Sequence, residues 1–254
     1  MGYHNSICMG IGEIGKPLYE LISGVFNTLP MDPIHFPDNK FTTCDMLHIC
    51  IPGNLRSFND LVVSATKITE AQFVIVHSTV IPGTIDAIQE RLLVPVVHSP
   101  VQGKHAGNKM KRDMLRYPKY LGVPETITKE QEEELTQYFE LAGFSLVKIV
   151  RGVKNTEWQK VLATSFFGYM IAWAQEVERI CDDNGLDFEA VTDTFKYIED
   201  IIPPHYPGVI GGHCVMANIE LVSKIYKSPA LEFVKNSNGL KEKRDSTELD
   251  EGDR

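Results

Sequence analysis

The sequence lacks the cysteine pairs, the basic charge and the long apolar runs that mark several large classes of protein. Its five cysteines, Cys8, Cys44, Cys50, Cys181 and Cys214, include no C-x-x-C pair and show no regular spacing. This argues against a zinc ribbon and against a disulfide scaffold. Free thiols suit a reducing compartment, so we expect a cytoplasmic protein.

Charge and hydropathy exclude further classes of partner. The 254 residues carry a formal net charge of −9, so a general affinity for nucleic acid or an anionic membrane is not expected. No apolar run approaches the length of a membrane span. The N-terminal MGYHNSICMGIG lacks the basic start and apolar stretch of a signal peptide. None of the histidines has metal-ligand spacing, so no metal is expected.

Up to about residue 150, short apolar runs alternate with helical segments. We expect buried strands at 6–9, 47–51, 73–77, 94–97, 120–123 and 146–149. Helical patterns at 58–69, 84–93 and 129–142 separate several of these strands. Such alternation predicts an α/β fold with a Rossmann-type parallel sheet.

The pattern changes after residue 150. Apolar residues recur every three to four positions from 155 to 184, and they cover the predicted helix almost all round. Such a helix is buried on several faces, so we expect it to contact both the first domain and a second subunit of a homodimer. The predicted order is an NAD-binding Rossmann domain (1–150), an all-helical catalytic and dimerisation domain with this long central helix (151–235), and a disordered polar tail (236–254).

A glycine motif follows the first predicted strand. Gly10, Gly12 and Gly15 form G-x-G-x-x-G around Ile11, Glu13 and Ile14. In a dinucleotide site these glycines allow a tight turn, the approach of a pyrophosphate and close packing of helix on strand. The amides at the following helix start favour an anion. The alternative is a glycine turn with a structural role alone.

Further cofactor contacts are expected after the second and later strands. Asp32 lies about 20 residues beyond the motif, where an acidic residue binds the adenosine ribose. Asp38 is its competitor, and a turn cap before Pro33 is the alternative role of Asp32. No arginine follows closely, which favours NAD over NADP. Pro52, Ser78 and Thr79 follow later strands and are expected at the ligand crevice, although a turn role is the alternative for the last two.

Four segments together resemble the UDP-glucose/GDP-mannose 6-dehydrogenase family, the nucleotide-sugar dehydrogenases. They are GIGEIG (10–15), HSTVIPGT (77–84), NTEWQKVLATSF (155–166) and PGVIGGHC (207–214). The resemblance implies NAD-dependent oxidation of a sugar C6 alcohol to the acid. It also implies that Cys214 is the nucleophile that traps the aldehyde, and that Lys160 stabilises oxyanion charge.

The residues themselves suit parts of this chemistry. Cys214 precedes an apolar helical run, and a helix N-terminus favours a thiolate. Gly212 lets backbone approach a ligand, and His213 is a possible ion partner of the thiol. The alternative for Cys214 is a small buried apolar side chain. On the long helix, Glu157, Lys160 and Thr164 share one face, and Glu157 is as well explained by capping or pairing.

A substrate is expected at the end of the fourth predicted strand. His98 and Ser99 lie there, and Lys104 and His105 begin a local basic run in an acidic chain. These residues suit a substrate phosphate, and a solvated loop is the alternative.

The chain departs from the family pattern in four ways. It ends before the family's third, nucleotide-binding domain, so it resembles a compact form of the family. The acidic residues expected after Pro100 are replaced by Val-Gln-Gly-Lys. Asn218 stands one helical turn after the cysteine where an aspartate is expected, and Thr164 stands where an asparagine is expected. Two alternatives therefore stay open: a two-electron dehydrogenase of the 3-hydroxyacid type that uses Lys160, and a catalytically silent NAD-binding protein.

Overall fold

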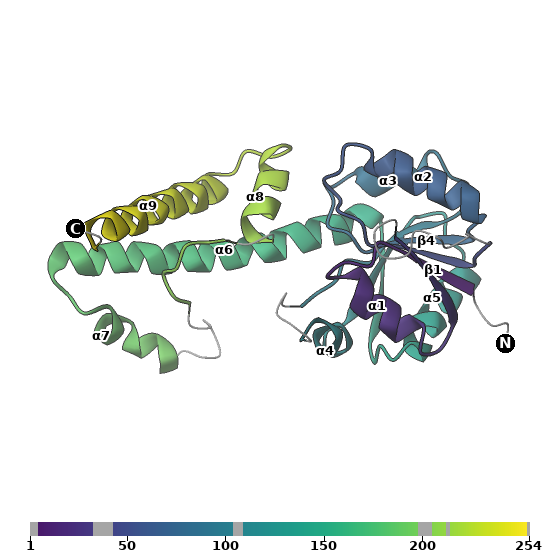
Figure 1. Ribbon diagram of the computed structural model, residues 1–254, viewed down its shortest axis with the longest axis horizontal. Coiled ribbons are helices and arrows are strands. Elements are labelled where there is room, and N and C mark those ends of the chain that lie inside the picture. The colour runs from purple at the N-terminus through teal and green to yellow at the C-terminus, as the bar shows by residue number, and fades with distance from the viewer. Residues whose placement is uncertain (1–4, 33–42, 104–108, 198–204, 212–213, 253–254) are drawn as a thin grey trace. The chain divides into compact units, whose positions relative to one another are not determined.

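The chain divides into two compact units in the computed structural model, which describes residues 5–32, 43–103, 109–197, 205–211 and 214–252. Unit 1 spans Met1–Lys160 and unit 2 spans Val161–Arg254. Their boundary lies within the 32-residue helix α6 (Val153–Asn184). The predicted α/β class, with a Rossmann-type sheet followed by helices, is confirmed (Figure 1).

The described part of unit 1 is built on one sheet with the strand order β2-β1-β3-β4-β5-β6-β7. All neighbouring strands are parallel except β5 and β6, and the sequence pattern did not predict this antiparallel pair. The strands are β1 (Asn5–Met9), β2 (Asn27–Met31), β3 (Met46–Ile49), β4 (Phe73–Val76), β5 (Val96–His98), β6 (Lys119–Val123) and β7 (Val147–Arg151).

Helices cover both faces of this sheet (Figure 1). One face packs against α1 (Gly15–Ile22), α4 (Lys109–Arg116) and α5 (Lys129–Leu141), with Leu18, Met114 and Phe139 among its buried residues. The other packs against α2 (Phe58–Thr69) and α3 (Thr84–Gln89). Burial on both faces explains why the strands are short continuous apolar runs.

The sequence pattern did not predict strand β2, and the reason is physical. Its sequence is NTLPM, and Pro30 has no N–H to donate to a neighbouring strand. Because β2 is the edge strand of the sheet, with β1 as its neighbour, the proline needs no partner on its other side.

Unit 2 contains the larger part of α6, then α7 (Phe188–Thr192), a short 3-10 helix (Asp193–Tyr197), α8 (Val215–Ser223) and α9 (Pro229–Gly252). Helix α6 ends as predicted at Asn184-Gly185, where Gly185 has φ +66° and Leu186 N–H donates to Cys181 O at 2.8 Å. Among the described helices, none has both the length and the apolar character needed to cross a membrane.

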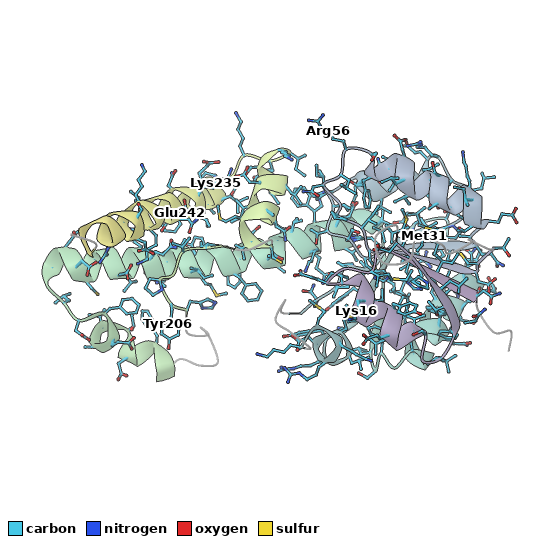
Figure 2. The ribbon with its side chains drawn as sticks, in the orientation of Figure 1. Lys16, Met31, Arg56, Tyr206, Lys235 and Glu242 are labelled. Carbon is cyan, nitrogen blue, oxygen red and sulfur yellow. The ribbon has the colours of Figure 1, made fainter. Side chains whose placement is uncertain are left out.

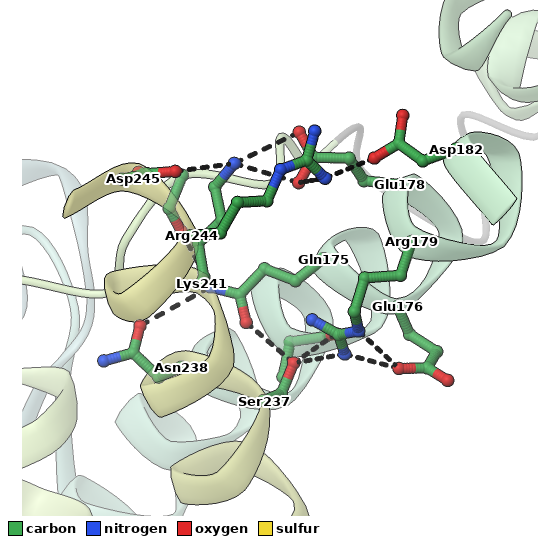
Figure 3. Close-up of polar contacts among 12 residues, drawn as sticks. Gln175, Glu176, Glu178, Arg179, Asp182, Ser237, Asn238, Lys241, Arg244 and Asp245 are labelled. Carbon is green, nitrogen blue, oxygen red and sulfur yellow. Dashed lines mark hydrogen bonds and ion pairs between the residues drawn. The ribbon is translucent and has the colours of Figure 1, made fainter. Parts of the chain in front are cut away.

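The segment expected to be a disordered tail is helical in the structure, because α9 extends through residue 252. Its polar side chains find partners on α6: Ser237 bonds Gln175 at 2.8 Å, Lys241 bonds Glu178 at 2.9 Å, and Arg244 pairs with Asp182 (Figure 3). The expectation of disorder rested on the polar composition of the tail. The polar and acidic side chains on α6 supply hydrogen-bond and ion-pair partners that composition alone does not reveal.

The described residues do not fully cover the apolar surface of α6. Ala172, Val177 and Cys181 are buried, whereas a row of larger side chains is exposed. The exposed row comprises Leu162, Phe166, Phe167, Tyr169, Trp173 and Ile180. Among the residues that the structure describes, the expected all-round burial of this helix is therefore only partly met.

Candidate active site

The loops after β1 and β3 meet at the point where the strand order of unit 1 reverses. Strand β1 has β2 on one side and β3 on the other. Residues 10–14 follow β1, and residues 50–53 follow β3. In open α/β sheets such a switch point, at the carboxyl ends of the strands, is where ligands bind.

The three motif glycines have distinct geometric roles. Gly10 has φ +91°, and a Cβ on Gly15 would lie 1.7 Å from Gly10 O, so both positions require glycine. A Cβ on Gly12 would meet nothing within 4 Å. Gly12 O accepts a hydrogen bond from the Lys16 amide at 2.9 Å. Lys16 lies at the start of α1 (Figure 2). Open space at Gly12 beside a helix N-terminus fits the approach of a pyrophosphate.

Asp32 directly follows β2 and lies beside the glycine loop. Its Oδ2 accepts a hydrogen bond from the Ile11 amide at 2.8 Å, and its side chain is largely buried. The structure therefore places an acidic group at the end of the second strand and in contact with the motif. The competitor Asp38 lies outside the described residues.

The loops after β3 and β4 are tied to each other. Ser78 Oγ donates to Ile51 O at 2.5 Å, and a Cβ on Gly53 would lie 2.2 Å from Thr79 O. Pro52 stands between Ile51 and Gly53, so it belongs to the pair of loops that these two contacts join. The Ser78 hydroxyl thus donates to a backbone carbonyl, which supports a structural role in the turn, the alternative given above for Ser78.

Glu157 is occupied by backbone groups of unit 1. Its carboxylate accepts bonds from the Gly83 amide at 2.7 Å and from the Ile85 amide at 2.9 Å. Burial raises the pKa of Glu157, while these two bonds oppose the shift. Glu157 is thus placed to cap α3, and this geometry favours the capping alternative over a catalytic role.

His98 and Ser99 are buried and have partners inside unit 1. His98 Nδ1 lies 3.0 Å from Thr156 Oγ1, and its Nε2 lies 3.3 Å from Ser78 O. Because a carbonyl can only accept, the neutral ring carries its hydrogen on Nε2, which leaves Nδ1 as an acceptor beside the Thr156 hydroxyl; that hydroxyl also donates to Val153 O at 2.9 Å. Burial lowers the pKa of His98 to about 3, with the bond to Ser78 opposing.

Ser99 Oγ donates to Tyr120 O at 2.9 Å. A substrate role for His98 and Ser99 stays a prediction that these contacts do not support. The other two residues expected to bind substrate at this strand end, Lys104 and His105, lie outside the described residues. The sequence analysis did not identify Thr156. A Cβ on Gly122 would lie 2.0 Å from the Thr156 hydroxyl, so the glycine lets α6 pack closely against β6 at this residue.

Lys160 reaches the loop after β5. Its Nζ donates to Val101 O at 2.8 Å, and its positive charge contributes to lowering the pKa of His98. Both neighbours lie at or beyond the carboxyl end of β5, the edge where the expected ligand residues gather. The helix thus brings an ammonium group to the ligand edge of unit 1.

Cys214 begins helix α8 in unit 2. Asn218 N–H donates to Cys214 O at 3.0 Å, as expected for residues one helical turn apart. A Cβ on Gly168 of α6 would lie 2.7 Å from Val215 Cγ1, so this glycine lets α8 pack closely. Thr164 lies one turn before Gly168 on α6. Gly212 and His213 lie outside the described residues.

The fold and the glycine loop define the Rossmann-type dehydrogenase architecture. Residues 154–238 match the model of the central domain of the UDP-glucose/GDP-mannose dehydrogenase family, which confirms the resemblance that the motifs indicate. No curated protein sequence matches this chain.

Solved structures share the fold at low sequence identity. A UDP-D-ManNAc dehydrogenase from Pyrococcus horikoshii aligns with a TM-score of 0.76 and 14% identity, over 94% of this chain and 68% of that chain. A UDP-glucose dehydrogenase from Pyrobaculum islandicum gives 0.74 and 15%, over 94% and 68%. The 3-hydroxyisobutyrate dehydrogenase of Mycobacterium tuberculosis gives 0.67 and 11%, over 96% and 94%.

Proposed function

We propose that this chain is an NAD-dependent dehydrogenase that oxidises a CH–OH group of a sugar or nucleotide sugar. The observation that carries the proposal is the family match over 154–238, because that segment contains Lys160, Thr164, Cys214 and Asn218. A dinucleotide-type loop in unit 1 supports it independently.

The cofactor is assigned to the switch point of unit 1. The backbone of Gly10–Gly15 would bind the pyrophosphate near Gly12, Asp32 would hold the adenosine ribose, and the loops with Pro52, Ser78 and Thr79 would line the cofactor site. The open space at Gly12 and the acidic group at the end of β2 both fit this assignment. When bound, NAD supplies the hydride acceptor, and one NADH forms per oxidation.

In the proposed reaction the alcohol first loses a hydride and a proton and becomes an aldehyde. The Cys214 thiolate then adds to the aldehyde carbon, and the oxygen takes up a proton to give a thiohemiacetal. Loss of a second hydride and a proton leaves a thioester. Water cleaves its C–S bond, which releases the acid and restores the thiol. Lys160 stabilises negative charge on the reacting oxygen in these steps.

Two-electron oxidation is the second candidate. Asn218 cannot accept a proton where an acidic residue would assist hydrolysis, which weakens the case for the thioester step. The likeness to 3-hydroxyisobutyrate dehydrogenase over nearly the whole of both chains also favours this candidate. In this reaction Lys160 polarises the alcohol oxygen and Cys214 forms no bond. A silent NAD-binding protein is the third alternative.

We also infer that the protein is a homodimer formed through α6. Phe166 and Trp173 have 60% and 49% of their surface exposed, and they belong to the exposed row already described. A row of large apolar side chains on one helix suits a self-complementary two-fold contact.

The test is NADH formation from NAD and a panel of UDP- and GDP-sugars, with wild-type protein and Cys214→Ala. Two NADH per sugar, abolished in Cys214→Ala and retained in Cys181→Ala, support the covalent mechanism. One NADH per substrate that survives Cys214→Ala supports simple alcohol oxidation. Binding of NAD without turnover of any sugar leaves a different substrate or the silent protein, and failure to bind NAD removes the whole proposal.

A further inference from the structure

A row of buried polar side chains crosses the sheet of unit 1 on the face covered by α1 and α5. Ser6 lies on β1, His48 on β3, His77 directly after β4, Lys119 on β6 and Tyr138 on α5. Each is at most 4% exposed. Buried strands of a parallel sheet are ordinarily apolar, so this row needs an explanation.

The five side chains form one unbroken chain of hydrogen bonds. Ser6 Oγ lies 2.7 Å from Tyr138 Oη, and Tyr138 Oη lies 2.9 Å from His48 Nε2. His48 Nδ1 lies 3.0 Å from His77 Nε2, and His77 Nδ1 lies 3.2 Å from Lys119 Nζ. Both nitrogens of both rings are therefore engaged. The described residues contain no group of three or more His, Cys, Asp and Glu that would suit a metal ion.

Lys119 ends this chain in an unusual setting for a lysine. Its Nζ lies 3.2 Å from His77 Nδ1 and 3.4 Å from Ser99 O, and 5.2 Å and 5.3 Å from the ring centres of Phe139 and Phe144. Burial lowers the pKa of Lys119 to about 7, and only Cys50 opposes the shift. The amine therefore changes its charge near neutral pH.

Both imidazoles stay neutral over the same pH range. Burial lowers the pKa of His48 to about 3, and burial together with the Lys119 charge holds the pKa of His77 well below its ordinary value. A neutral ring has one N–H and one acceptor nitrogen. The hydrogen bonds must then all point the same way along the chain.

The series of hydrogen bonds can point in two directions, and each direction is compatible with one charge state of Lys119. When the amine is protonated it can donate both to Ser99 O, 3.4 Å away, and to His77 Nδ1, 3.2 Å away. Donation to His77 Nδ1 puts the hydrogen of both rings on Nε2, and the hydrogen bonds then point toward Ser6. When the amine is neutral, His77 Nδ1–H turns to Ser99 O at 2.9 Å. His48 then donates from Nδ1, Tyr138 donates to His48, and Ser6 donates to Tyr138.

We propose that these five side chains are a proton relay whose hydrogen bonds reverse direction when Lys119 loses its proton. In the reversal the Lys119 proton passes to His77 Nδ1, and the His77 Nε2 proton passes to His48. The His48 Nε2 proton passes to Tyr138, and the Tyr138 proton passes to Ser6. Ser6 is itself 1% exposed, so its own proton leaves to solvent when the start of β1 opens beside the exposed Asn5. One proton leaves, and no group along the chain gains net charge.

Other titratable groups lie against the relay. Cys50 raises the pKa of Lys119 against the effect of burial. Burial raises the pKa of Tyr138 most, and Cys8, Cys44 and Asp45 raise it further. His98 faces Lys119 from β5 and is neutral. This inference does not depend on the proposed dehydrogenase function.

The test follows the histidine tautomers and the Lys119 charge by NMR of the full chain. Long-range proton–nitrogen correlation with ¹⁵N-histidine distinguishes Nε2–H from Nδ1–H rings, and ¹³C-lysine reports the Lys119 amine. His48→Gln, His77→Gln and Lys119→Met assign the signals by their loss. Lys148→Met is the matched control, because Lys148 is an exposed strand lysine above the Tyr120 ring.

We expect His48 and His77 to change together from Nε2–H to Nδ1–H as pH rises, with the same midpoint as Lys119, near pH 7. In Lys119→Met both rings stay in one form, whereas Lys148→Met behaves as wild type. Should Lys119→Met fail to fold, the wild-type titration alone decides the matter. Tautomers that stay constant while Lys119 titrates, or rings with separate midpoints, would overturn the proposal.

Discussion

Gly12 and Gly15 offer a matched pair of substitutions that separates cofactor binding from folding. A Cβ at Gly12 meets nothing within 4 Å, and its backbone is not in the left-handed region. Gly12→Ala should therefore leave the fold intact and stabilise it by about 0.4–1 kcal/mol through the unfolded chain. A Cβ at Gly15 lies 1.7 Å from Gly10 O, so Gly15→Ala must displace backbone.

The methyl group of Gly12→Ala occupies the space into which we place the pyrophosphate. Loss of one charge-assisted hydrogen bond from the backbone weakens binding by about 1.5–3 kcal/mol. This corresponds to about a 10- to 150-fold rise in the Kd for NAD. Gly15→Ala should instead lower the free energy of unfolding by about 1–3 kcal/mol or more, as overpacking does.

Titration calorimetry with NAD and thermal unfolding of both variants measure the two effects separately. We expect Gly12→Ala to unfold at or slightly above the wild-type temperature and to bind NAD weakly. Gly15→Ala should unfold at a clearly lower temperature. If Gly12→Ala folds normally and binds NAD with wild-type affinity, the pyrophosphate does not lie at this loop and the cofactor assignment is wrong.

Three further predictions follow from other parts of the chain. Glu157→Gln should lower the free energy of unfolding by about 1–3 kcal/mol, because the glutamine NH₂ group cannot accept the bond that a carboxylate oxygen accepts from the Gly83 or Ile85 backbone amide. Thermal unfolding measures this loss, with the exposed Glu90→Gln as the control. The folded pKa of Lys119 is about 7, below its ordinary 10.5, so the unfolded chain binds more protons between these values. Stability should therefore rise with pH across this window by up to about 1.4 kcal/mol per pH unit in urea denaturation, and Lys119→Met should abolish the rise. Trp173→Glu should yield monomers in light scattering, and a wild-type monomer at micromolar concentration would refute the α6 dimer.

Local patterns of sequence were sufficient where one segment determines its own conformation. The run from β1 through GIGEIG into α1 requires no distant partner to be recognised, and the structure has the strand, the loop and the helix in those places. The end of α6 at Gly185 is similarly local, because a left-handed residue stops a helix. The i, i+4 relation of Cys214 and Asn218 needed only the prediction of one helix.

Elements that depend on a distant partner were harder to predict. Strand β2 contains Pro30, which disfavours a strand unless the strand is known to lie at a sheet edge. Helix α9 is polar, and its folding rests on Gln175 and Glu178 of α6, more than 60 residues away along the chain. Composition alone therefore favoured disorder there.

The long helix shows why periodicity predicts the face of a helix better than the role of a residue. Spacing places Glu157, Lys160 and Thr164 on one face, which made all three candidates for a catalytic role. In unit 1, however, Glu157 reaches the start of α3, while Lys160 reaches Val101 O beyond β5. A glutamate that accepts from two backbone amides has little freedom to act on a substrate, whereas the Lys160 ammonium lies at the carboxyl edge of the sheet and donates to Val101 O. Side-chain length and the position of the neighbouring loops, which no periodicity encodes, therefore separate a residue that holds the fold from one suited to chemistry.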